Sequence, residues 1–81
     1  MFFTAEMLKE LMEEKPFRPF RVFLTNGRQY DVPNHDAAFI TENKLEIGLD
    51  LNKKGFAQRT VNCAYGHIAN IEEIESKAKK N

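Results

Sequence analysis

The chain has 81 residues, enough for a single domain over residues 1–81 and too few for two. Hydrophobic residues make up 42% of it and charged residues 30%, which is typical of a folded globular protein. Twelve Lys and Arg balance twelve Asp and Glu, and this balance argues against a dedicated binder of duplex DNA. Cys63 is the only cysteine, and no apolar run is long enough to span a membrane. We therefore expect a cytoplasmic protein without disulfides.

The first segment, residues 4–15, has the pattern of an amphipathic helix. Thr4 is suited to cap its N-terminus, Glu6 falls in the first turn, and Pro16 disfavours helical backbone at the residue before it. Apolar side chains recur at helical spacing on one side, and charged side chains take the other. The apolar positions are Met7, Leu8, Leu11 and Met12. We expect this helix to be held by packing its apolar side on the rest of the chain.

Residues 20–32 have the pattern of a β-hairpin, because apolar and polar side chains alternate on both sides of an Asn-Gly turn. A two-residue turn would pair Val22 with Asp31 and place a charge on the apolar face. A three-residue loop that ends in a left-handed glycine instead pairs Val22 with Tyr30 and sets Arg21 opposite Asp31 on the outer face. We predict this second register. Its buried face carries Phe20, Val22, Leu24, Tyr30 and Val32.

A second hairpin is predicted over residues 38–51, where the second half alternates apolar and polar side chains most regularly. We expect one face of this strand to be buried, carrying Leu45, Ile47, Leu49 and Leu51. Residues 56–63 predict a further strand, with Cys63 as a small core residue. Its inner side is expected to carry Ala57, Val61 and Cys63.

The segment 68–74 is ambiguous, because its isoleucines recur every three residues. That spacing suits a helix, and a short strand fits as well. We favour the strand. Residues 75–81 are expected to form a charged, mobile tail.

One N-terminal helix followed by five or so short antiparallel strands is the plan of a small SH3-like or Sm-like barrel. Near closure of such a barrel also reduces the number of exposed strand edges. We therefore expect a mainly β fold, with a helix over residues 4–15, a barrel over residues 17–74 and the tail after it.

Residues 15–27 read Lys-Pro-Phe-Arg-Pro-Phe-Arg-Val-Phe-Leu-Thr-Asn-Gly. This run resembles the signature of a family of short uncharacterised bacterial proteins, in which Pro-Phe-x-Pro-Phe-Arg enters a strand that ends in Asp-Gly or Asn-Gly. The resemblance extends to His67-Ile68 and Ile71-Glu72. It covers most of residues 15–73 and implies a bacterial protein, and it supplies no activity.

Two shorter stretches, residues 22–27 and 65–68, are similar to segments of bacterial Sm-like proteins of the Hfq type. That family has an N-terminal helix, a strand ending in Asn-Gly, and a late Tyr-Lys-His segment followed by small and aliphatic residues. Gly66 stands here where that segment has its lysine. The resemblance implies a ring-forming RNA binder.

No set of residues predicts catalysis or a bound cofactor. His35, Cys63 and His67 are the residues best suited to metal binding or nucleophilic chemistry, and their spacing recommends no arrangement of either kind. The four glycines are isolated, so the chain has no glycine-rich loop for a phosphate. We expect a protein without enzyme activity, metal or cofactor.

Two functions remain open. Seven phenylalanines in so short a chain predict more apolar surface than one small core covers, and an incompletely closed barrel leaves strand edges unpaired. We therefore predict an interaction module that binds itself, as a dimer more than as a ring of six, or another protein. The alternative is Sm-like RNA binding, because arginines near aromatic rings suit single-stranded RNA. The residues expected to contact RNA or a partner are Arg18, Arg28, Tyr65 and His67.

Overall fold

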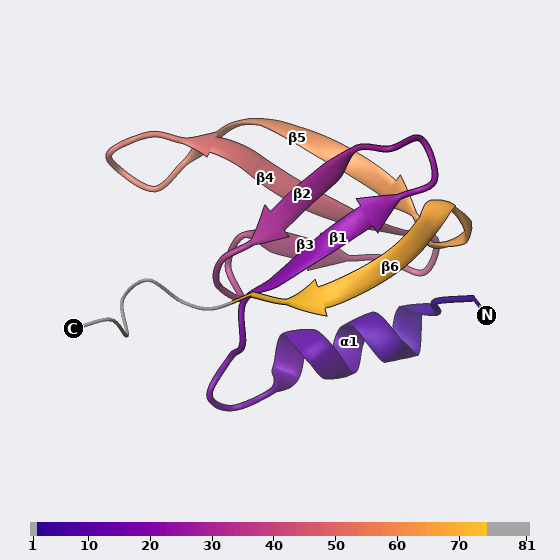
Figure 1. The fold of residues 1–81 in the computed structure, drawn as a ribbon. Coiled ribbons are helices and arrows are strands. Elements are labelled where there is room, and N and C mark those ends of the chain that lie inside the picture. Colours follow the sequence, from indigo (N-terminus) through magenta and orange to yellow (C-terminus); the bar gives the residue numbers. More distant parts are fainter. Residues whose placement is uncertain (1, 75–81) are drawn as a thin grey trace.

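The computed structural model describes residues 2–74 (Figure 1). The fold is mainly β, as predicted, with one short α-helix and two three-stranded antiparallel sheets. The charged tail expected at residues 75–81 lies outside the described residues. In chain order the elements are α1 (Ala5–Glu13), β1 (Phe20–Leu24), β2 (Gln29–Val32), β3 (Ala38–Ile40), β4 (Lys44–Leu51), β5 (Ala57–Ala64), the 3-10 turn η1 (Tyr65–His67) and β6 (Ile68–Glu73).

Helix α1 begins after Thr4, whose hydroxyl oxygen accepts a hydrogen bond from the backbone N–H of Met7 at 3.2 Å. The predicted N-terminal cap is therefore confirmed. Glu14 already has extended backbone, so the helix ends at Glu13 and not at residue 15. Pro16 disfavours helical backbone just before it, and the chain turns toward β1 there. Leu8 is fully buried where α1 crosses β3 and β4, and it anchors the helix.

The first sheet has the strand order β2-β1-β6, and its hairpin has the predicted register. Val22 pairs with Tyr30, and Arg21 pairs with Asp31. The N–H of Leu24 donates to the carbonyl of Arg28 at 2.9 Å, which leaves a three-residue loop closed by Gly27 at a φ of 90°. The predicted inner face is confirmed, because three of its five residues are buried and the other two are half-buried. The buried residues are Phe20, Val22 and Val32, and the half-buried ones are Leu24 and Tyr30.

The ambiguous segment after η1 is strand β6, which pairs with β1. Val22 pairs with Ile71 and Leu24 with Ile68, and the register shifts between these two pairs. This irregularity places one extra residue in β6, so two side chains three positions apart lie on the same face. The three-residue spacing of Ile68 and Ile71 therefore reflects a β-bulge and not a helix.

The second sheet has the strand order β3-β4-β5. Leu45 and Ile47 are fully buried on its inner face, and Cys63 on β5 is buried beside Leu45, as predicted. The expectation for Leu51 is wrong, because its side chain is 46% exposed. The far half of the β4–β5 hairpin extends beyond the first sheet, so no opposing face covers that leucine (Figure 1).

The β4–β5 hairpin is bent near its middle. Asp50 has a positive φ of 55°, an uncommon conformation for a residue with a side chain. A Cβ atom at Gly48 would lie 3.0 Å from the Cβ of Ala57, so only glycine lets the two strands approach so closely. Asn52 closes the tip through its side-chain oxygen, which accepts hydrogen bonds from the N–H groups of Lys54 and Phe56.

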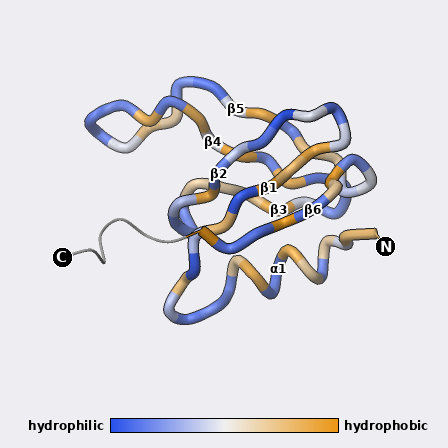
Figure 2. Tube along the Cα trace, in the orientation of Figure 1, coloured by the Kyte–Doolittle hydropathy of each residue, from blue (hydrophilic) through white to orange (hydrophobic). Residues whose placement is uncertain are grey.

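The core lies between the two sheets, with α1 covering one side (Figure 1). Hydrophobic and hydrophilic residues alternate along β4, so the second sheet turns one apolar face inward (Figure 2). The buried residues are Leu8, Phe20, Val22, Val32, Ala37, Leu45, Ile47, Cys63, Tyr65 and Ile68. Every described element except β3 contributes to this core.

The predicted barrel is not confirmed. Within residues 2–74 no strand of one sheet pairs with a strand of the other, so the sheets remain separate. β2 ends the first sheet after four residues, and the chain then crosses to the second sheet through a loop that begins at Pro33. In the same residues the longest helix, α1, is too short and too polar to cross a lipid bilayer.

Replacing Ile47 by Ala should lower the free energy of unfolding by about 2–4 kcal/mol, because it leaves a cavity at the centre of the core. That loss is a large part of the roughly 4–12 kcal/mol expected for a chain of this length. Glu13→Ala should cost less than about 0.5 kcal/mol, since Glu13 is exposed. Denaturant titration of both variants measures the difference. Equal losses would contradict the core assignment.

Candidate functional site

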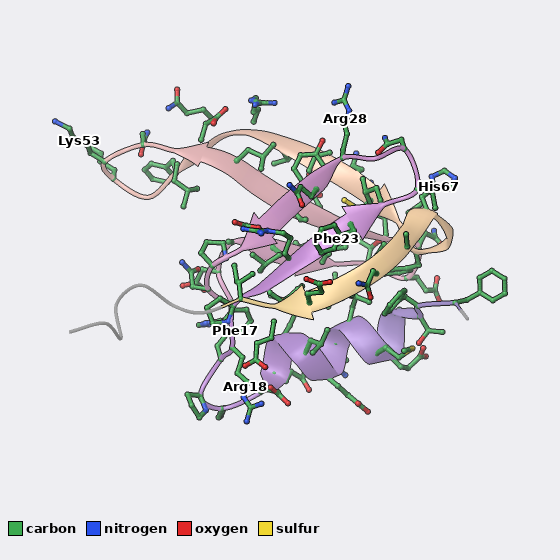
Figure 3. All side chains as sticks on the ribbon, in the orientation of Figure 1. Phe17, Arg18, Phe23, Arg28, Lys53 and His67 are labelled. Atoms are coloured by element: carbon green, nitrogen blue, oxygen red, sulfur yellow. The ribbon has the colours of Figure 1, made fainter. Side chains whose placement is uncertain are left out.

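Arg18 lies in the connection between α1 and β1, away from the other residues predicted to contact RNA or a partner (Figure 3). Its guanidinium is 3.7 Å from a carboxylate oxygen of Glu14 and 3.8 Å from one of Glu73. The side chain is 63% exposed, so these contacts are surface ion pairs of small energy. Their structural effect is to link the end of α1 to the end of β6.

Arg28 and His67 lie at the opposite end of the molecule, on two neighbouring turns (Figure 3). The backbone N–H of Thr25 donates to the carbonyl of His67 at 2.9 Å, which ties the β1–β2 loop to η1. The side-chain oxygen of Asn26 accepts from the N–H of Arg28 at 2.9 Å and orders the loop itself. Both Arg28 and His67 are exposed. The structure therefore brings together these two predicted residues and separates them from Arg18.

Tyr65 is only 8% exposed, and its ring is part of the core. The hydroxyl oxygen is 2.6 Å from the carbonyl oxygen of Thr41 and 2.8 Å from that of Lys44, so it donates its hydrogen into the β3–β4 turn. Burial raises the pKa of the phenol, and the carboxylate of Glu6 raises that pKa further. The ring leaves little surface on which a base could stack. In this position Tyr65 joins η1 to the β3–β4 turn.

Arg21 and Asp31 form the best-aligned ion pair of the first sheet. Nε of Arg21 is 2.6 Å from one carboxylate oxygen, and its second nitrogen donates to the other at 3.1 Å. This bidentate hydrogen bonding lowers the pKa of Asp31 and raises the pKa of Arg21. The two charges neutralise each other on the outer face, as the predicted register requires.

The groups suited to catalysis do not converge. Cys63 is buried, and burial raises the pKa of its thiol, which disfavours the reactive thiolate. His35 lies beside Asp36 in an exposed loop, with 3.2 Å between Nε2 and a carboxylate oxygen. Within residues 2–74 no group of three or more His, Cys, Asp and Glu side chains is placed to hold a metal ion.

The strand edges are the surfaces that remain. Within the described residues the two sheets have four edge strands: β2 and β6 in one sheet, β3 and β5 in the other. β3 has only three residues, and β6 carries a bulge and two glutamates. Short strands, bulges and charges are the usual protection of an edge. β5 lacks most of it, and β2, which is also short, has a single charge, Asp31, that is paired with Arg21.

β5 is the longest edge strand, with eight residues and one charged side chain, Arg59. That guanidinium is paired with Asp50 across the hairpin. The N–H of Gly48 donates a hydrogen bond to the carbonyl of Ala37, beside β3. Backbone groups of successive residues in a strand point to opposite sides, so the N–H and C=O groups of the odd-numbered residues of β4 point toward β5. On β5 the backbone groups of Thr60 and Asn62 therefore point to the open edge. Figure 1 shows β5 along the upper margin of the molecule.

β2 borders a groove of about 600 Å³ between the first sheet and the β4–β5 hairpin. The N–H of Leu24 pairs with Arg28, so the same alternation directs the backbone groups of Gln29 and Asp31 away from β1. No backbone hydrogen bond within residues 2–74 uses these outward groups. The groove is lined by Arg21, Gln29, Tyr30, Asp31, Pro33, Gly48, Leu49, Asp50 and Leu51.

Apolar side chains are exposed on several elements, as the phenylalanine count predicts. Phe39 on β3 is 67% exposed and Phe56 at the tip of the β4–β5 hairpin is 66% exposed. The other large apolar residues with exposed side chains are Phe2, Met7 and Leu51. Sequence reasoning identified this surplus and did not place it on β3 or at the tip of the β4–β5 hairpin. The unbroken eight residues of β5, with a single charge, were the signal for an unprotected edge.

Comparisons with protein-family models, with curated proteins and with solved structures found no match. The resemblances to the short bacterial family and to the Sm-like proteins therefore stay predictions.

Replacing Tyr65 by Phe should lower the free energy of unfolding by about 1–2 kcal/mol, because the half-buried carbonyls of Thr41 and Lys44 lose the donor that they share. Tyr30→Phe is the matched control, since no hydrogen bond of its hydroxyl is formed within the described residues. Denaturant titration compares the two variants. Equal stability of both would show that the Tyr65 hydroxyl does not hold the turn.

Proposed function

We propose that this protein is a non-enzymatic interaction module of the bacterial cytoplasm, and that its first partner is a second copy of itself. The fold from which it works is an incompletely closed SH3-like or Sm-like barrel. The observation that supports this function is the open edge of β5, which is long, uncharged at its outward positions and without a partner strand in the described residues.

Edge strands with these properties pair with other strands, because their outward N–H and C=O groups are free to form hydrogen bonds. This pairing does not require the core side chains to move. Two copies of β5 that run antiparallel present the same groups to each other. Asn62 then forms a hydrogen-bonded pair with Asn62 of the other copy, and Thr60 pairs with Ala64 of that copy. Arg59 introduces no repulsion, because Asp50 of the same copy neutralises it.

The geometry favours a dimer. Antiparallel pairing of one strand with itself has two-fold symmetry, and it uses up the edge on both copies. A ring of six would need two different edges of each copy to meet in a head-to-tail contact. Within residues 2–74 three other edges could serve as the second one. Two of them are poorly suited, because β3 is short and β6 is charged.

At micromolar concentration the protein should therefore have twice the 9.4 kDa mass of the single chain, measured by light scattering. Asn62→Lys should shift the mass toward one chain, because two lysines meet across the pairing and repel. Gln29→Lys is the matched control: it adds the same charge on the edge of β2 and should leave the dimer intact. A mass near 9.4 kDa for the unmodified chain at every concentration would contradict self-association.

RNA binding is the alternative, and one observation favours it: Arg28 and His67 are exposed on adjacent turns that a backbone hydrogen bond holds together. A guanidinium and an imidazole at one end of the molecule would donate hydrogen bonds to phosphates. The neutral chain gives only a weak field to attract RNA, and the Tyr65 ring is buried. We therefore place self-association first.

Titration with short uridine- and adenine-rich RNA should show no binding tighter than about 100 μM at 50 mM salt, because few phosphate contacts are available. Fluorescence anisotropy with labelled RNA measures this directly. Micromolar binding that weakens steeply with salt would replace the proposed function by the alternative. In that case Arg28→Ala should weaken binding and Arg18→Ala, at the other end of the molecule, should not.

A further inference from the structure

We propose that the groove between β2 and the β4–β5 hairpin binds an extended segment of another polypeptide, which adds to β2 as an antiparallel strand. This site is separate from the edge of β5 and does not depend on self-association. Its components are an open backbone edge, an apolar floor and a neutral rim.

The backbone edge supplies the affinity for a strand. Gln29 and Asp31 direct both N–H and C=O into the groove, and within residues 2–74 neither group has a backbone partner. Unpaired backbone groups of this kind are satisfied by water or by an added strand. An extended segment presents donors and acceptors at the same spacing, which a small molecule does not. β2 has four residues, so the paired part of the segment is about 13 Å long.

The floor of the groove selects apolar side chains. Tyr30 lies on the inner face of β2, and Leu49 and Leu51 extend the inner face of β4 beyond the core. Leu49 is half-buried and Leu51 is 46% exposed, so both retain apolar surface that a bound segment would cover. Alternate side chains of an added strand point to this floor, and the others point outward.

The rim selects against acidic segments and against nucleic acid. The charged residues of the lining are Arg21, Asp31 and Asp50, two carboxylates and one guanidinium. Arg21 pairs with Asp31, and Arg59 neutralises Asp50 from outside the groove. No cation in the lining is free to receive a phosphate or a carboxylate. The ligand that fits is an extended segment with apolar residues at alternate positions and neutral polar residues between them.

The β4–β5 hairpin restricts what reaches β2. It forms part of the floor and the opposite wall of the groove, through Gly48, Leu49, Asp50 and Leu51. A single extended chain fits into such a groove. The edge strand of a folded sheet does not fit, because its neighbouring strands would clash with the wall. This distinguishes β2 from β5, whose edge has no wall beside it within the described residues. The occupant is therefore an extended segment and not a second folded copy.

The free protein gives the first test. Hydrogen exchange measured by NMR should be fast at the N–H groups of Gln29 and Asp31 and at least about tenfold slower at those of Tyr30 and Val32, which pair with β1. Slow exchange at Gln29 and Asp31 in the monomeric Asn62→Lys variant would show that the edge of β2 is already paired. That result would overturn the proposal.

Binding is tested with the synthetic peptide acetyl-Lys-Thr-Val-Thr-Val-Thr-Lys-amide, added to the isotope-labelled protein. We expect saturable shifts of the Gln29 and Asp31 amide signals with a dissociation constant of about 1 mM or tighter. The Asn62→Lys variant should bind equally well, so failure of self-association does not affect the result. No saturable shift up to about 10 mM peptide, or shifts confined to β5, would overturn the proposal.

Two matched comparisons identify the mode of binding. In an antiparallel added strand, residues whose N–H groups point to β2 have side chains on the outer face, so the threonines form the hydrogen bonds. N-methylation of the threonines should weaken binding at least about tenfold, and N-methylation of the valines should leave it within about threefold. Equal effects of both would contradict strand addition.

The second comparison concerns the floor. Leu51→Lys should weaken binding about tenfold, because it places a charge where the valines pack. Phe56→Lys is the control, since it adds the same charge to the same hairpin at an exposed position outside the groove. An equal loss in both variants would show that the hairpin acts through its net charge and not through the groove.

Discussion

Within residues 2–74, two three-stranded sheets packed face to face leave four strand edges, and this constraint governs the rest of the described structure. Every edge strand has backbone donors and acceptors that its own sheet does not satisfy. Within residues 2–74, β3 and β6 carry the usual protection in the form of shortness, a bulge and acidic side chains. β5 lacks most of it, and β2 has only its shortness and one paired charge. The surfaces on which this protein would act follow from that difference.

The bend in the β4–β5 hairpin determines where the groove along β2 and the open edge of β5 lie. Gly48 allows Ala57 to approach, and Asp50 takes up the left-handed backbone that redirects the strand. Beyond this point the hairpin leaves the core, so Leu51 has no opposing face and becomes one wall of the groove along β2. The same projection leaves the side chains in the first half of β5 exposed. A side chain at Gly48 would therefore disturb the groove and the edge together.

The sequence predicted the local structure well where side-chain polarity and loop length determine it. The register of the first hairpin follows from the cost of placing Asp31 on an apolar face, and Arg21 confirms it by pairing with that carboxylate. The spacing of the isoleucines left helix and strand both open for the segment that forms β6, and the reason is physical. A bulge shifts the two-residue period by one, and the spacing of three that results is the same as that of a helix.

The local sequence pattern could not predict whether the two sheets close into a barrel, or where the candidate surfaces lie. Whether β2 meets β4 depends on where a bend in another hairpin directs that strand, and neither segment encodes this alone. Tyr65 was singled out from a short motif, and its burial depends on a turn 21 to 24 positions earlier in the chain. The direction of each backbone N–H on β5 depends on the register of β3 with β4, through Gly48 and Ala37.

The two open edges differ in what can reach them, so they do not compete. Pairing at β5 needs an approach from the outside of the second sheet, where the edge stands free within the described residues (Figure 1). Strand addition at β2 needs an approach between the sheets, where the hairpin admits one extended chain. A dimer formed through β5 would therefore keep both of its grooves open. A partner with two suitable segments would bind such a dimer more tightly than the single chain, because the second segment binds from a high local concentration.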